Sequence, residues 1–144
     1  MRYEEPLYRP PSEANSLLIQ CTIGCPHNAC AFCGMYKSKR FRIRPVKETL
    51  EDIHLARLFY GPDAVRTVFL PDGNTIIMRT EQLEEILKAL YETFPRLERV
   101  TSYGASRIII RKKKEHFVRL RRAGLTRLHV GIESGDGVTL ERIK

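Results

Sequence analysis

The sequence predicts an α/β fold with a parallel sheet, arranged as an open, partial (β/α) barrel of about four βα units. Short β-branched and apolar runs alternate with segments whose apolar residues recur every three or four positions. Turn signals such as Gly61-Pro62 and Pro71-Asp72-Gly73-Asn74 separate these segments. The chain has 144 residues, fewer than the roughly 200–250 of a complete (β/α)8 barrel, so we expect one core.

Each expected strand is a short apolar or β-branched run that leads into a loop. Because the carboxyl ends of parallel strands share one edge of the sheet, we expect ligands to gather at these loops. The expected strands are residues 16–21, 66–70, 99–104 and 127–133.

The expected helices lie between these strands and show the periodicity of an amphipathic helix. The second is the clearest, since six apolar residues from Leu83 to Phe94 share one face and Pro95 ends the run. The expected helices are residues 46–60, about 81–94, about 111–123 and a last one that follows Gly137. We expect residues 1–15 to form an extended N-terminal arm and residues 22–44 to form a loop.

A four-stranded open sheet leaves its last strand edge uncovered, which costs stability unless something covers it. The last expected helix has only begun at Lys144. We therefore expect the chain to be the N-terminal part of a longer one, or to need a missing C-terminal segment or an oligomer partner.

Composition narrows the class of protein. The net charge of +8 favours anionic partners such as nucleotides or RNA without identifying one. The N-terminus lacks a basic segment followed by an apolar run, and no window approaches about 20 apolar residues, so we expect no membrane partner. The four cysteines crowd into residues 21–33, too close together to staple a domain, which predicts a metal site in a reducing, cytoplasmic compartment.

The cysteines have spacings C-x3-C, C-x4-C and C-x2-C within Cys21-Thr-Ile-Gly-Cys25-Pro-His-Asn-Ala-Cys30-Ala-Phe-Cys33. A four-cysteine zinc site usually separates two C-x2-4-C pairs by a longer spacer, and the spacer here is short. An iron–sulfur cluster suits the crowding better, because one tight loop can reach three of its irons. Three thiolates would leave one iron open to a cofactor, whereas four would suit electron transfer.

These residues carry a resemblance. The segment from Gly24 to Tyr36 resembles the cluster loop of radical S-adenosylmethionine (radical SAM) enzymes, which implies a [4Fe-4S] cluster on Cys25, Cys30 and Cys33. The usual family pattern is C-x3-C-x2-C, and one extra residue lies between Cys25 and Cys30. Cys21, at the end of the first strand, is most simply a buried thiol and otherwise a substitute ligand or a reactive thiol.

The resemblance continues along the chain, from about Ser16 to Lys144. Asp72-Gly73-Asn74 is similar to the family's Gly-Gly-Glu segment, which binds the amino group of the cofactor. The segment from Arg127 to Gly135 resembles the fourth-strand signature of the branch that includes coproporphyrinogen oxidases and Elongator-like and methylthiotransferase-like proteins. The resemblance implies that Glu133 and Ser134 lie near the ribose and methionine ends of S-adenosylmethionine. The family core has six βα units, so residues 16–144 would be an incomplete core.

Several of these residues keep a second interpretation. Glu133 suits the two ribose hydroxyls but also a salt bridge at a strand end. Phe32 and Tyr36 suit the adenine ring but also simple packing. Ser102 is placed to donate to the cofactor carboxylate or, equally, to backbone.

The leading hypothesis is a radical SAM enzyme that cleaves S-adenosylmethionine reductively to a 5′-deoxyadenosyl radical, which abstracts hydrogen from an unknown substrate. It implies a reducing electron donor that resembles flavodoxin or ferredoxin, and basic residues 37–44 suit either that donor or an anionic substrate. Basic residues 111–122 suit RNA or, more simply, a solvated helix face. The alternatives are a non-catalytic metal-binding module that contacts nucleic acid and an iron–sulfur electron-transfer protein.

Overall fold

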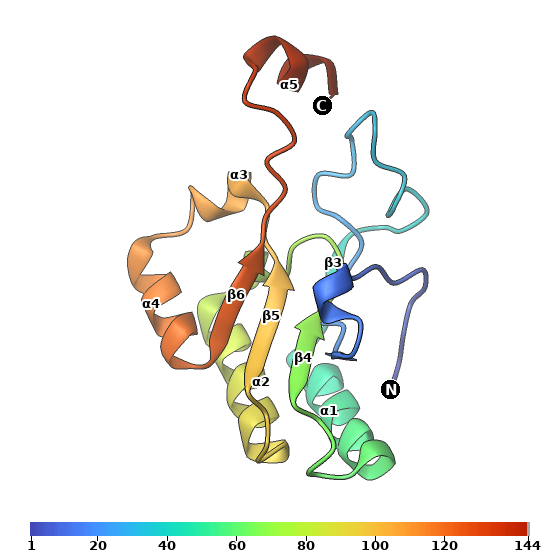
Figure 1. The fold of residues 1–144 in the computed structure, drawn as a ribbon, viewed down its shortest axis with the longest axis vertical. Coiled ribbons are helices and arrows are strands. Elements are labelled where there is room, and N and C mark those ends of the chain that lie inside the picture. The colour runs from blue at the N-terminus through green and yellow to red at the C-terminus, as the bar shows by residue number, and fades with distance from the viewer. Residues whose placement is uncertain (144) are drawn as a thin grey trace.

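The computed structural model describes residues 1–143 and contains a four-stranded parallel sheet in the order β1-β4-β5-β6 (Figure 1). Every neighbouring pair is parallel, with Leu17 opposite Val68, Val68 opposite Val100, and Tyr103 opposite His129. The predicted α/β fold with an open parallel sheet is therefore confirmed. The strands are β1 (Leu17–Leu18), β4 (Thr67–Leu70), β5 (Arg99–Tyr103) and β6 (Leu125–His129).

Three longer helices cover one face of this sheet, as the alternating pattern predicts. They are α1 (Val46–Tyr60), α2 (Thr80–Thr93) and α4 (Lys114–Arg122). The structure adds a short α3 (Ser106–Ile109) that the sequence did not predict, and the expected third helix begins at Lys114 rather than near Arg111. The last helix, α5 (Gly137–Ile143), begins where Gly137 predicts it.

The fourth strand is shorter than predicted, and this is a correction. It ends at His129, whereas the apolar pattern predicted a strand to Glu133. Its neighbour β5 ends at Tyr103, which is opposite His129, so residues beyond His129 have no strand to pair with. Val130 and Ile132 are accordingly exposed.

The expected loop of residues 22–44 is closed at its base by a small antiparallel ladder, which the sequence did not predict. It consists of β2 (Thr22–Ile23) and β3 (Arg42–Ile43), and the Arg44 N–H donates to the Cys21 carbonyl at 3.0 Å. The ladder brings the two ends of the cysteine loop together beside the sheet.

The core forms between the sheet and helices α1 and α2. The apolar face predicted for α2 is buried except for Tyr91, which is partly buried, and α1 contributes Ile53 and Ala56 to the same cluster as Val68 and Val100 of the strands. Each fully buried Leu or Ile side chain contributes roughly 1.5–3 kcal/mol. The buried apolar residues of α2 are Leu83, Ile86, Leu87 and Leu90.

The N-terminal arm lies against the opposite face of the sheet, in front of it in Figure 1. Its short 3-10 helix η1 (Pro11–Glu13) buries Glu13, which accepts from the Ser16 hydroxyl at 2.6 Å and lies 3.2 Å from the His129 Nε2. Burial opposes ionisation of Glu13, but these hydrogen bonds outweigh it and lower the pKa of the carboxyl below its ordinary value. The rings of Phe69, Tyr103 and His129 meet edge to face on the same side of the sheet.

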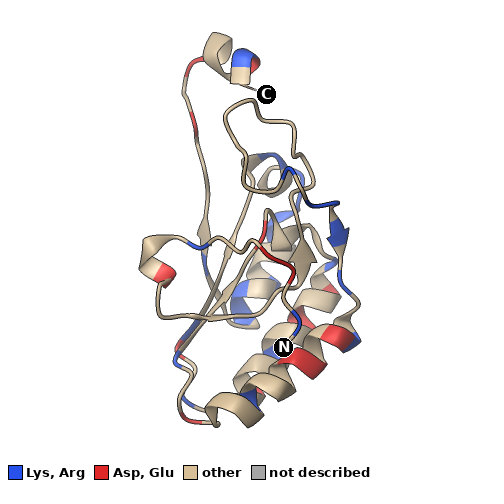
Figure 2. Cartoon of the chain, turned by 90° about the vertical axis from the view of Figure 1, so that its right-hand side faces the viewer, with Lys and Arg blue, Asp and Glu red and all other residues tan. Residues whose placement is uncertain are grey.

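The chain beyond β6 leaves the sheet and carries α5 past its carboxyl edge, toward the cysteine loop (Figures 1 and 2). One backbone hydrogen bond joins the two segments, from the Ala31 N–H to the Ile143 carbonyl at 2.9 Å. Lys144, the last residue of the expected core, lies outside the described residues. Between Met1 and Ile143, no helix combines the length and the apolar character that crossing a bilayer requires.

Gly124, between α4 and β6, provides a test of the fold. Its φ is +110°, and a Cβ there would collide with the Tyr91 ring, whose hydroxyl donates to the Gly124 carbonyl at 2.9 Å. We expect Gly124→Ala to lower the free energy of unfolding by about 1–3 kcal/mol. Gly135→Ala is the control, because no atom lies within 4 Å of a Cβ at that position. Urea titration measures both, and equal stability of the two variants would contradict the expectation.

Candidate functional site

The cysteine loop leaves β2 at the carboxyl edge of the sheet. Cys25, Cys30 and Cys33 are free and partly exposed, and a turn brings the Cys33 N–H to 3.4 Å from the Cys30 carbonyl. Asn28, with a φ of 45°, donates from its amide to the Tyr36 carbonyl at 2.8 Å and so ties the two halves of the loop together. The three thiols predicted as cluster ligands therefore lie on one loop, which is held by hydrogen bonds within the loop.

Asp72 occupies the base of this loop and is completely buried. Its Oδ2 accepts from the Gly24 N–H at 2.7 Å, from the Gln20 amide at 3.0 Å and from the Lys39 ammonium at 3.1 Å. The predicted role of Asp72 in binding the cofactor stays a prediction. Its carboxylate already receives three donors from the protein itself.

Gly73 brings the end of β4 directly against Cys25. Its N–H donates to the Gly24 carbonyl at 2.9 Å. A Cβ at Gly73 would lie 2.7 Å from the Cα and Cβ of Cys25 and 3.0 Å from its Sγ. Only glycine allows so close an approach, because any side chain would displace the cysteine.

The Asn74 side chain lacks any partner within residues 1–143, as do the Thr22 and Tyr36 hydroxyls of the cysteine loop. It is fully buried, and neither its Oδ1 nor its Nδ2 makes a hydrogen bond. A buried amide without partners costs free energy, so such a group is typical of a place that a ligand completes.

The aromatic candidates differ in exposure. Phe32 is 54% exposed and free to meet a ligand, whereas Tyr36 is 4% exposed. Tyr36 packs edge to face against Tyr8, and burial raises the pKa of its hydroxyl far above the ordinary value. Tyr36 thus holds the loop against the N-terminal arm in this structure, and its predicted contact with adenine stays a prediction.

The remaining candidates lie at the end of β5 and in the segment between β6 and α5. Ser102, buried at the end of β5, donates to the carbonyls of Tyr103 and Leu70 at 3.0 and 3.4 Å, the backbone interpretation that the sequence left open. Glu133 is exposed, with a φ of 64°, in the segment beyond β6. The Ser134 hydroxyl accepts from the Asp136 N–H at 3.0 Å.

Two basic residues at this edge make contacts that the sequence did not predict, although Lys39 lies within the basic segment 37–44 that the sequence singled out. Lys39 reaches Asp72 beneath the loop, and Arg107 of α3 lies with its Nη1 3.1 Å from the His27 Nδ1. Both contacts join positions more than 30 residues apart, so no local pattern signals them. His27 is thereby placed in contact with α3.

The residue types of this loop suit an iron–sulfur cluster, because a cluster takes one cysteine thiolate at each of several irons. Among residues 1–143, no three His, Cys, Asp or Glu side chains converge in this structure to hold a single metal ion. Gly73 lies directly against Cys25, and the next residue, Asn74, has a buried amide without a hydrogen-bond partner.

The fold and this loop define a class: a parallel α/β protein with a cysteine-rich loop at the carboxyl edge of its sheet. The profile of the Radical SAM superfamily matches residues 19–144, and the chain belongs to this superfamily. Enzymes of the superfamily use a [4Fe-4S] cluster and S-adenosylmethionine.

Coproporphyrinogen III oxidase from Escherichia coli, described as a radical SAM enzyme, has a similar fold. The TM-score is 0.62 at 20% sequence identity, and the match covers 89% of this chain. The chain spans 30% of that structure. A comparison of this chain with curated proteins found no match.

Cys21 provides a test of the site, because it differs from the other three thiols. It is buried, as the sequence predicts, and burial raises the pKa of its thiol to about 12. The thiolate is the reactive form, so below that pH Cys21 stays protonated and shielded. We expect iodoacetamide at mildly alkaline pH to alkylate Cys25, Cys30 and Cys33 in the native apoprotein and to leave Cys21 unmodified, as read by peptide mass spectrometry. Alkylation of Cys21 as fast as the others would contradict its burial.

Proposed function

We propose that this chain carries the cofactor-binding part of a radical SAM enzyme, with a [4Fe-4S] cluster held by Cys25, Cys30 and Cys33. When bound and reduced, this cluster supplies the electron that cleaves S-adenosylmethionine to methionine and a 5′-deoxyadenosyl radical, which takes hydrogen from a substrate. The observation that carries the proposal is the packing of Gly73 against Cys25, which joins the cysteine loop to the end of β4.

The protein's own part is to bind and orient these groups. The three thiolates hold three irons and leave the fourth open to the cofactor. Within residues 1–143, no protein group uses the Asn74 amide, and its oxygen suits the amino group at the methionine end of the cofactor as a hydrogen-bond acceptor. Asp72 and Gly73 set the position of that segment.

The other cofactor contacts are proposed by resemblance together with exposure. Phe32 is exposed and suits the adenine face, and Tyr36, which is buried in the same loop, is proposed for the same ring. Glu133 suits the ribose hydroxyls, and Ser134 and Ser102 suit the methionine end. Glu133 and Ser134 lie beyond β6, on the segment that leads to α5.

The proposal implies further partners. An electron must reach the cluster from a donor that resembles flavodoxin or ferredoxin, in a cytoplasm where thiols stay reduced. Exposed Lys37 and Arg40 follow the cluster ligands and suit an acidic donor or an anionic substrate. An RNA substrate would find basic residues 111–114 near α3, and the substrate itself stays unassigned.

Reconstitution with iron and sulfide under anaerobic conditions tests the proposal. We expect a brown protein whose reduced form cleaves S-adenosylmethionine to methionine and 5′-deoxyadenosine in the presence of dithionite. Alanine at Cys25, Cys30 or Cys33 removes a ligand and abolishes iron binding, while Cys21→Ala retains it. Iron analysis and product chromatography measure both effects. Colourless zinc binding, or a cluster lost on Cys21→Ala, would contradict the assignment.

Asn74→Leu separates ligand binding from folding. The amide makes no hydrogen bond, so leucine of similar volume should leave the free energy of unfolding unchanged or raise it slightly. We expect the same substitution to weaken S-adenosylmethionine binding about tenfold, equivalent to about 1.4 kcal/mol. Calorimetric titration of the reconstituted protein and urea unfolding of the apoprotein measure the two effects. A large loss of stability with unchanged cofactor affinity would assign Asn74 a structural role instead.

A further inference from the structure

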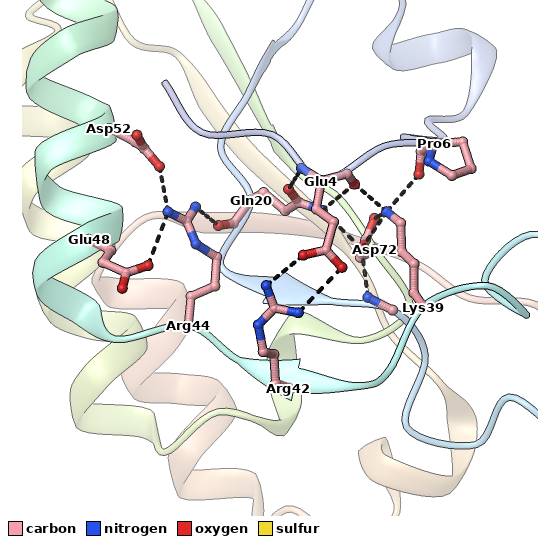
Figure 3. A network of polar contacts seen from close by, with 10 residues as sticks. Glu4, Pro6, Gln20, Lys39, Arg42, Arg44, Glu48, Asp52 and Asp72 are labelled. Atoms are coloured by element: carbon pink, nitrogen blue, oxygen red, sulfur yellow. Dashed lines mark hydrogen bonds and ion pairs between the residues drawn. The ribbon is translucent and has the colours of Figure 1, made fainter.

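One buried lysine of the cysteine loop, Lys39, contacts the N-terminal arm. The Lys39 ammonium donates to the carbonyls of Glu4 and Pro6 at 2.5 and 2.7 Å, and it lies 3.1 Å from the Asp72 Oδ2 (Figure 3). The side chains of Lys39 and Asp72 are 2% and 0% exposed. Segments from the start of the chain, from the cysteine loop and from the end of β4 therefore meet at one buried ion pair.

A second side chain repeats this connection. The Gln20 amide donates to Asp72 at 3.0 Å and to the Glu4 carbonyl, while its oxygen accepts from the Glu4 N–H at 3.0 Å. Arg42 of β3 pairs with the Glu4 carboxylate at 2.5 Å. Glu4 is thus held by its backbone and by its side chain.

Asp72 is also connected, through Gly24 and Gly73, to Cys25, the first of the proposed cluster ligands. Its Oδ2 fixes the Gly24 N–H, the Gly24 carbonyl fixes the Gly73 N–H, and Gly73 lies against Cys25. A continuous series of contacts thus runs from Glu4 and Pro6, through Lys39 and Asp72, to Cys25. Burial matters here, because a charge left unpaired away from water is costly and forces its surroundings to rearrange.

We propose that Lys39 and Asp72 are positioning residues, through which the N-terminal arm fixes Cys25 for cluster binding. The inference rests on the proposed function for the identity of the cluster, and it deepens that proposal. Asp72 then acts on the cluster through Gly24 and Gly73. The arm then contributes to the site by positioning Cys25, although it lies outside the segment that resembles the family.

A second buried pair supplies the matched control. Arg44 and Asp52 lie 2.7 Å apart with side chains 6% and 3% exposed, and the Arg2 N–H donates to Asp52 at 2.9 Å. This pair also ties the N-terminal arm to the body of the protein. Arg44 donates to the Gln20 carbonyl at 2.7 Å, but neither residue of this pair contacts Gly24, Gly73 or Cys25 through a hydrogen bond or ion pair within residues 1–143.

The first readout needs no cluster. Lys39→Met and Asp72→Asn each remove one charge at nearly constant volume, and Arg44→Met does the same at the control pair. We expect the first two variants to raise the alkylation rate of Cys25 in the native apoprotein about tenfold, with Cys30 and Cys33 little changed. Arg44→Met should leave the rate at Cys25 within about twofold of the original, whatever it does to the melting temperature.

The second readout uses the reconstituted protein. Partners that orient a metal ligand typically contribute about 10- to 100-fold to metal affinity, so we expect iron release to a chelator to accelerate by that factor in Lys39→Met and Asp72→Asn. Arg44→Met should release iron at the original rate. An equal acceleration of iron release in all three variants would mean that the effect comes from lower overall stability, and it would overturn the proposal.

The outcomes separate the two proposals. If the unaltered chain binds no iron, the proposed function fails, while the alkylation rates still decide whether the pair positions Cys25. If Cys25 reacts equally fast in all variants, the positioning role fails and the cluster assignment stands. Should the variants not fold, hydrogen exchange of the unaltered chain decides: protected Gly24 and Gly73 amides are expected, and rapid exchange at both would overturn the proposal.

Discussion

The burial of one carboxylate, that of Asp72, organises the carboxyl edge of this sheet. An ionised group removed from water must find donors, and Asp72 draws them from Gln20, Gly24 and Lys39. Gln20 precedes the cysteine loop, Gly24 lies near its start and Lys39 lies near its end. The hydrogen bonds and the ion pair to Asp72 therefore hold the loop against the end of β4. Gly73 makes this close approach sterically possible.

Different interactions hold the segments that cover the two faces of the sheet. Helices α1 and α2 cover one face with apolar side chains that pack at helical spacing, and this layer forms most of the core. The N-terminal arm meets the other face through Glu13, whose ionised form is kept by hydrogen bonds despite burial. The arm thus stabilises the sheet at Glu13 and the cysteine loop at Glu4, so a segment with little regular structure supports both.

The elements that local pattern specifies were predicted well, and those that depend on partners were not. The bounds of α1 agree with the prediction, because its helical periodicity and the Gly61-Pro62 stop are local signals. The end of β6 was predicted four residues too late, since an apolar run shows β propensity but cannot show that β5 ends at Tyr103. The β2–β3 ladder was missed for the same reason: two-residue strands form only where the chain brings them together.

The sequence by itself determined which chemical groups this protein carries: closely spaced cysteines, a glycine that permits close approach, and alternating elements that put loops at one edge. Those properties follow from residue type and spacing. Only the tertiary structure decided which side chains serve that edge. Lys39 appears as one more basic residue in a polar loop, and its burial against Asp72 depends on an encounter across 33 residues of sequence. Long-range contacts of this kind arise from the packing of the whole chain, which no local pattern encodes.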